Sequence, residues 1–164
     1  MDWGHTRAYG LGFAGLYLNL KGREKNGIVE PGSQREALLN ELQEKLLAIR
    51  DPKNGTPVVL QIYRTDKVYS GPFKLEAPDL IVGYNRGYRA SWETTLGKFP
   101  RELLRDNKEK WSGDHLVAPE VVPGILLASK KIKTESPALY DLAPSILAEF
   151  GVPRPDEMIG KNVF

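Results

Sequence analysis

The clearest hydrophobic pattern along the chain predicts an amphipathic helix over about 34–50. Apolar residues recur at helical spacing, with Glu and Lys on the opposite side, at Leu38, Leu39, Leu42, Leu46, Leu47 and Ile49. Ser33 and Glu36 have the spacing of a capping box, so we expect Ser33 to cap this helix. The turn-forming run 51–55 (Asp-Pro-Lys-Asn-Gly) ends it.

A second helix is predicted over 139–150. Ser136-Pro137 supplies its start, and Gly151 followed by Pro153 supplies its end. Pro144 falls in the first turns, where proline is tolerated better than in the middle of a helix.

Four other runs predict β-strands, at 12–20, 58–64, 80–84 and 124–129. The first alternates Leu16, Leu18 and Leu20, and the glycines before it indicate bends or close backbone approach. Val68-Tyr69 either extends the second strand or forms a short strand of its own.

Strands interleaved with two helices indicate the α/β class, with a mixed sheet and flanking helices. The length of 164 residues is that of one domain, so we expect 1–164 to form a single domain. The stretch 86–112 has no sustained period, although its polar part 101–110 could form one short helix. A loop of that length is usually functional or disordered, and Trp92 and Trp111 argue against disorder.

Composition narrows the class of partner. The 23 basic and 21 acidic residues give a net charge of +2, so we expect no nucleic-acid partner, and the short run 130–133 (Lys-Lys-Ile-Lys) is interpreted as a solvated turn. No apolar run approaches the roughly 20 residues of a membrane-spanning helix, so we expect no membrane partner. The absence of cysteine excludes disulfides and thiolate metal sites, and leaves the compartment open.

His5 and His115 are the two histidines of the chain. His115 lies in a glycine-containing loop before an apolar run, and catalytic groups and metal ligands concentrate on such loops. Zinc takes three or four protein ligands, and no second histidine stands at a metal-site spacing. Asp114 is not taken as a ligand, because adjacent side chains often point apart. No HExxH, P-loop, Rossmann or GxSxG motif is present. On these grounds alone, His115 is a hydrogen-bonded loop histidine or one metal ligand.

Nearly the whole chain carries short stretches that occur in the same order in a known protein family. They are 2–9 (Asp-Trp, then Thr-Arg-Ala-Tyr), 16–24, 27–29, 77–84, 87–92, Trp111-Ser112-Gly113-Asp114-His115, Val122-Pro123-Gly124 and 141–144, with Gly151 and Pro155. In this combination the chain resembles the C-terminal portion of alkaline phosphatase superfamily proteins of the type I phosphodiesterase/nucleotide pyrophosphatase group. His5 and Gly4 depart from that pattern, where Arg and Ser are usual, and 116–118 (Leu-Val-Ala) is more apolar than expected.

The resemblance implies a partial alkaline-phosphatase-like domain, the C-terminal part of a larger metal-dependent phosphohydrolase. Members hydrolyse small-molecule phosphate esters with a Ser or Thr nucleophile and two divalent metals, usually zinc. Gly113-Asp114-His115 matches the family's Gly-x-His, which makes His115 a metal ligand. The nucleophile lies upstream of the matched region in the family, so no catalytic residue is assigned here. The isolated chain is expected to be inactive and to retain little or no zinc.

An alternative is a non-catalytic binding or structural domain that kept the fold without the chemistry. A fragment of a larger sheet would also expose unpaired strand edges, so we expect homo-oligomers through those edges.

The sequence leaves the roles of two sets of residues open. Asn19, Lys21, Arg23 and Glu24 either close a turn or contact substrate. Tyr84, Tyr88, Arg89 and Trp92 either pack the long loop onto the sheet or clamp a nucleotide.

Overall fold

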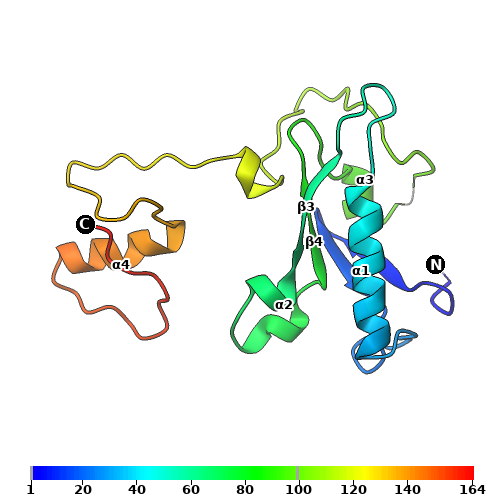
Figure 1. Cartoon of the computed structure of the whole chain (residues 1–164), viewed down its shortest axis with the longest axis horizontal. Helices are drawn as coiled ribbons and strands as arrows, with labels where there is room; N and C mark the ends of the chain where they lie inside the picture. The colour runs from blue at the N-terminus through cyan, green and yellow to red at the C-terminus, as the bar shows by residue number, and fades with distance from the viewer. Residues whose placement is uncertain (1, 99) are drawn as a thin grey trace. The chain divides into compact units, whose positions relative to one another are not determined.

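The computed structural model describes residues 2–98 and 100–164, and the chain divides into two compact units (Figure 1). The first unit extends to Pro123 and the second is Gly124–Phe164. No helix in the described ranges combines the length and apolar character needed to cross a lipid bilayer.

The first unit is built on a four-stranded sheet in the order β1-β2-β4-β3. Its strands are β1 (Ala8–Leu11), β2 (Gly15–Leu18), β3 (Val59–Arg64) and β4 (Leu80–Tyr84). Every neighbouring pair is antiparallel, so the predicted mixed sheet is wrong for the strands that the structure describes. The predicted strands at 58–64 and 80–84 are confirmed, and the α/β class holds as a mixture of helices and this sheet.

The predicted strand over 12–20 is confirmed over its central part as β2, the second arm of a hairpin whose first arm, β1, was not predicted. β1 and β2 pair from Ala8 with Leu18 to Leu11 with Gly15. Gly12 has a φ of 73° in the connecting turn, a conformation that favours glycine. At Gly15, a Cβ atom would lie 3.1 Å from the Leu11 carbonyl oxygen, so this glycine permits the close backbone approach that the sequence indicated.

Helix α1 (Ser33–Leu47) confirms the predicted first helix and lies alongside β3 and β4 (Figure 1). Its leucines pack with the apolar residues of three strands in one core. The buried residues of that core are Leu18, Val29, Leu38, Leu39, Val58, Val59, Ile62, Leu80 and Val82. The predicted capping box is wrong. Gly32 precedes the helix without a side-chain cap, and Glu36 pairs with Arg35 and Arg64 instead.

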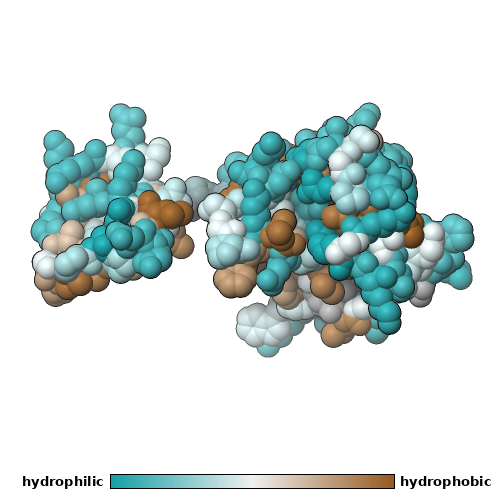
Figure 2. All heavy atoms as spheres, turned by 90° about the horizontal axis from the view of Figure 1, so that it is seen from below, coloured by the Kyte–Doolittle hydropathy of each residue, from teal (hydrophilic) through white to brown (hydrophobic). Residues whose placement is uncertain are grey.

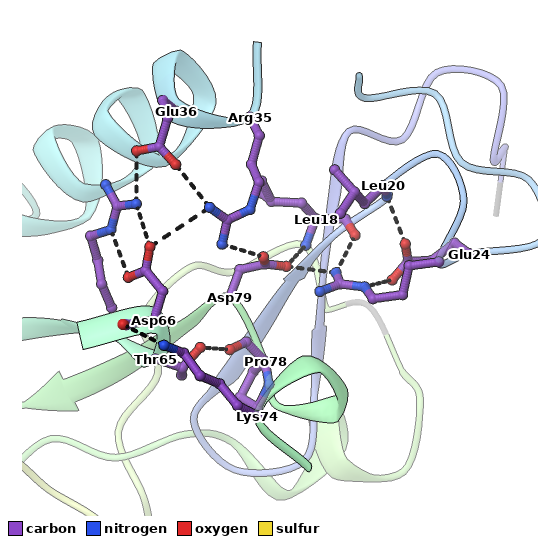
Figure 3. A network of polar contacts seen from close by, with 12 residues as sticks. Leu18, Leu20, Glu24, Arg35, Glu36, Thr65, Asp66, Lys74, Pro78 and Asp79 are labelled. Carbon is purple, nitrogen blue, oxygen red and sulfur yellow. Dashed lines mark hydrogen bonds and ion pairs between the residues drawn. The ribbon is translucent and has the colours of Figure 1, made fainter. Parts of the chain in front are cut away.

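A buried carboxylate ties α1 to the sheet. Asp79 stands immediately before β4, and its side chain is 2% exposed. Its Oδ2 atom accepts hydrogen bonds from the Leu18 backbone N–H (2.8 Å) and from Arg23 (2.6 Å), and its Oδ1 accepts one from Arg35 (3.1 Å). Figure 3 shows Asp79 between the Arg35 guanidinium and the backbone of Leu18. The network joins β2, the turn after it, α1 and β4 at one point.

The connections contain short helices that the sequence pattern did not indicate. Thr65–Val68 forms α2, so the predicted strand at Val68-Tyr69 is wrong, and Pro72–Glu76 forms the 3-10 helix η1. In the long irregular stretch, Trp92–Thr95 forms α3, whereas 101–110 contains no helix. That segment offers only Leu103 and Leu104 as apolar residues, too few for an apolar stripe. The 3-10 helix η2 (Pro119–Val121) follows.

The second unit consists of α4 (Leu139–Glu149) and the C-terminal tail, and α4 confirms the predicted second helix. Asp141 accepts hydrogen bonds from the backbone N–H groups of Ala138 and Lys161, both at 2.9 Å. Ser145 accepts one from Val163 N–H at 3.0 Å. Gly160 passes so close to α4 that a Cβ atom there would lie 2.1 Å from the Tyr140 carbonyl oxygen. The tail is therefore fixed along α4 mainly through polar contacts.

The predicted strand over 124–129 is not a strand in the structure. Ile125 and Leu127 are 88% and 89% exposed. An extended segment becomes a strand only when a neighbour pairs with its backbone, and no described residue pairs with this one.

Figure 2 shows apolar side chains at the surface of both units.

Candidate metal-ligand loop around His115

His115 lies at the surface of an irregular segment between Trp111 and η2, and its side chain is exposed. The other histidine, His5, pairs with Asp2 at 2.8 Å, and both of those side chains are largely exposed. Among the described residues, no group of three or more His, Cys, Asp or Glu side chains could hold a metal ion. Zinc takes three or four protein ligands, and the described residues do not bring that many together around His115.

Asp114 is held by contacts within the protein. Its Oδ1 accepts a hydrogen bond from the Leu116 backbone N–H at 2.9 Å, which closes a local turn. Its Oδ2 pairs with Arg89 at 3.4 Å, and the two side chains are 14% and 13% exposed. The Asp114 carboxylate therefore fixes the loop.

Aromatic rings support Arg89 from the other side. Its guanidinium carbon lies 4.8 Å from the centroid of the Trp92 ring. Trp92 in turn meets Phe13, in the β1–β2 turn, in an edge-to-face contact with centroids 5.4 Å apart. A guanidinium can stack on an aromatic face and pair with a carboxylate at once. The chain of contacts Phe13–Trp92–Arg89–Asp114 thus connects the hairpin to the residue before His115.

The segment after His115 is anchored to the end of β4. Ala118 is fully buried, and its N–H donates to the Tyr84 carbonyl oxygen at 2.8 Å. Gly83 makes room for this contact. A Cβ atom at position 83 would lie 2.8 Å from the Tyr63 ring and 3.1 Å from the Ala118 Cβ.

A short hydrogen bond strengthens the same anchor. The Tyr63 hydroxyl donates to Glu120 at 2.5 Å. Burial, followed by this hydrogen bond to a carboxylate, raises the pKa of Tyr63 above its ordinary value. The same bond lowers the pKa of Glu120. Both directions correspond to a neutral phenol that donates to an ionised carboxylate, and this hydrogen bond links η2 to β3.

The residues following β2 close a turn. The buried Asn19 amide nitrogen lies within hydrogen-bonding distance of the backbone carbonyl oxygens of Trp3, Thr6 and Asn26 and shares its two hydrogens among them. Glu24 accepts a hydrogen bond from the Leu20 N–H at 2.7 Å. Arg23 pairs with Asp79, and Lys21 pairs with Glu30. These contacts favour the turn interpretation over substrate contact for all four residues.

The second open set packs the long loop onto the sheet. The Tyr88 hydroxyl donates to Asp51 at 2.8 Å, Arg89 pairs with Asp114, and Trp92 lies against Phe13. Tyr84 is mostly enclosed, and its burial raises the pKa of the phenol. These contacts favour the packing interpretation over a nucleotide clamp.

Sequence reasoning missed the contacts that hold the His115 loop. Arg89 and Asp114 are 25 positions apart, Tyr63 and Glu120 are 57 apart, and no local spacing rule connects such pairs. The one sequence signal at this place is Gly83 inside an apolar run, because a glycine within a strand often marks close approach of another segment.

No protein-family model matches the chain, and no curated protein or solved structure matches it either. The family resemblance therefore rests on the sequence motifs alone, and the function drawn from it is a proposal.

Proposed function

We propose that this chain is the C-terminal part of a metal-dependent hydrolase of phosphate esters, similar to phosphodiesterases and nucleotide pyrophosphatases, and that His115 supplies one metal ligand. The observation that carries the proposal is the placement of His115. Its imidazole is exposed, while the residues on both sides are held, Asp114 by Arg89 and Ala118 by Tyr84. A ligand on a loop with fixed ends needs little ordering when a metal binds.

The chemistry expected of His115 is simple. It would hold the metal through one neutral ring nitrogen. A bound divalent metal supplies Lewis-acid activation of a phosphoryl oxygen or of an attacking oxygen. The remaining ligands and the Ser or Thr nucleophile are proposed to come from polypeptide outside these 164 residues, in a domain of the alkaline phosphatase type. Two zinc ions would occupy the completed site.

The test uses the longer gene product that the proposal requires. Its zinc content and its hydrolysis of a chromogenic phosphodiester are compared for the unmodified protein, His115→Ala and the matched control His5→Ala. Loss of a ligand is expected to remove zinc and to lower hydrolysis on the order of 100-fold. His5→Ala is expected to retain both within about twofold, because the His5 imidazole pairs with Asp2 where both side chains are largely exposed.

Full zinc content and full activity in His115→Ala would contradict the proposal. A reading frame without an upstream nucleophile and without further Asp or His ligands would support the alternative function, that of a non-catalytic binding or structural domain.

A further inference from the structure

We propose that Arg89 is a positioning residue for His115, acting through Asp114. The inference rests on the proposed role of His115 as a metal ligand. It assigns to Arg89 the task of holding the loop in the conformation that presents the imidazole.

The geometry places Arg89 between two partners. Its guanidinium stacks on Trp92 at 4.8 Å and pairs with Asp114 at 3.4 Å, and it is 13% exposed. Ion pairs shielded from solvent are screened less than exposed pairs. The ion pairs Lys53–Asp106 and Arg105–Glu93 of the long loop are more exposed and lie further upstream.

The effect on His115 follows from the length of chain left between fixed points. With Arg89 in place, the loop is held at Asp114 and at Ala118, four residues later. Four residues span at most about 14 Å, so the imidazole between them has little freedom. Without the Arg89 pair, the next ion pair upstream is that of Asp106, twelve residues before Ala118. A free segment three times as long samples many more conformations.

Asp114 also makes a contact in which Arg89 takes no part. Its Oδ1 accepts from the Leu116 N–H, which an Asn side chain would also do. The variant Asp114→Asn can therefore keep the local turn while removing the charge that Arg89 requires. If positioning depends on the ion pair, Asp114→Asn and Arg89→Ala have the same effect.

The experiment measures backbone order parameters of the full 164-residue chain by ¹⁵N relaxation, without metal or substrate. In Arg89→Ala and in Asp114→Asn, the values at 113–116 are expected to fall from about 0.85 to below about 0.6. The His115 ring signals narrow in parallel, and the His5 ring is the internal reference because the chain has two histidines. Arg89→Lys keeps the charge and is expected to give intermediate values.

The matched control is Arg7→Ala, which removes the partly exposed pair between Arg7 and Glu41 at 3.1 Å. It is expected to leave the loop at 113–116 unchanged. A merely structural role for Arg89 would lower Tm and loosen the first unit evenly, and that result would overturn the proposal. Unchanged order at 113–116 in Arg89→Ala, or an Arg89→Lys variant as mobile as the alanine variant, would overturn it as well. Loop order is independent of zinc content, so failure of the proposed function would be seen separately.

Discussion

Arg23 and Asp79 are 56 residues apart in the chain and meet in an ion pair of 2.6 Å. The Asp79 side chain is 2% exposed, and it also accepts hydrogen bonds from Arg35 and from the Leu18 N–H. One carboxylate thus satisfies two guanidinium groups and a backbone donor where the hairpin, α1 and β4 meet.

Replacement of Asp79 by Ala is expected to destabilise the first unit by about 3–5 kcal/mol, because it leaves partly buried cations without their partner. Urea unfolding followed by tryptophan fluorescence reports on this unit alone, since Trp3, Trp92 and Trp111 all belong to it. The control Asp106→Ala removes an exposed pair with Lys53 and is expected to change stability by less than about 1 kcal/mol. Equal effects of the two variants would mean that the buried network contributes no special stability.

Gly83→Ala is expected to disturb the anchor of the His115 loop. The added methyl group would meet the Tyr63 ring at 2.8 Å and the Ala118 side chain at 3.1 Å, and such overpacking costs about 1–3 kcal/mol. Faster hydrogen exchange at the Ala118 N–H would report the loss. Gly113→Ala, in the same loop, has no atom within 4 Å of the new Cβ and should leave that exchange rate unchanged. Protection of Ala118 in both variants would refute the packing argument.

The docking of the C-terminal tail is expected to weaken in acid. Hydrogen bonds from the Ala138 and Lys161 N–H groups lower the pKa of Asp141 below its ordinary value. A carboxyl whose pKa is lowered by folding stabilises the folded state above its unfolded pKa of about 3.9. That stabilisation is lost as the pH falls through the lower folded value.

Amide exchange at Lys161 and Val163 measures this effect between about pH 5 and pH 2. Asp141→Asn should remove the pH dependence, because the amide does not titrate over this range. Asp156→Asn, which changes an exposed carboxylate of the same unit, should leave it intact. Equal protection of the Lys161 and Val163 amides at the two ends of this pH range would contradict the role given to Asp141.

The isolated chain is expected to show no phosphodiester hydrolysis, with or without added zinc, because no nucleophile is assigned within it and His115 fits only one ligand position. A chromogenic phosphodiester assay with His115→Ala as the baseline measures this. Turnover well above that baseline would show that the chain carries a catalytic site of its own.

Self-association through sheet edges is the fifth expectation. β1 and β3 are the outer strands of the sheet, and each pairs with one neighbour among the described strands. Light scattering at high concentration is expected to give a mass above that of one chain. Leu60→Lys places a charge on the edge strand β3 and should reduce association, whereas Leu75→Lys, outside the strands, should not. A strictly monomeric mass for the unmodified chain would refute this prediction.

Elements with a strong local signal were predicted well. α1 and α4 carry apolar side chains at helical spacing between turn residues, and β3 and β4 are short apolar runs between such residues. Errors arose where one pattern suits two structures. Val68 closes the helical turn α2, although valine favours strands, and 124–129 has the composition of a strand but no partner. The Ser33 cap failed because Glu36 has stronger partners in Arg35 and Arg64.

By itself, the sequence determined the two long helices, α1 and α4, and the apolar runs that form β3 and β4, and it singled out His115 through its residue type and its motif. Those properties depend on neighbours a few positions away, which local spacing captures. The tertiary structure alone decided that the sheet is antiparallel, that Asp79 joins two arginines, and that Arg89 holds Asp114 beside His115. The ion pairs of Asp79 and Arg89 join residues 25 or more positions apart, and the sheet joins β2 to β4, which lie far apart in the sequence. Only the folded chain brings such residues together.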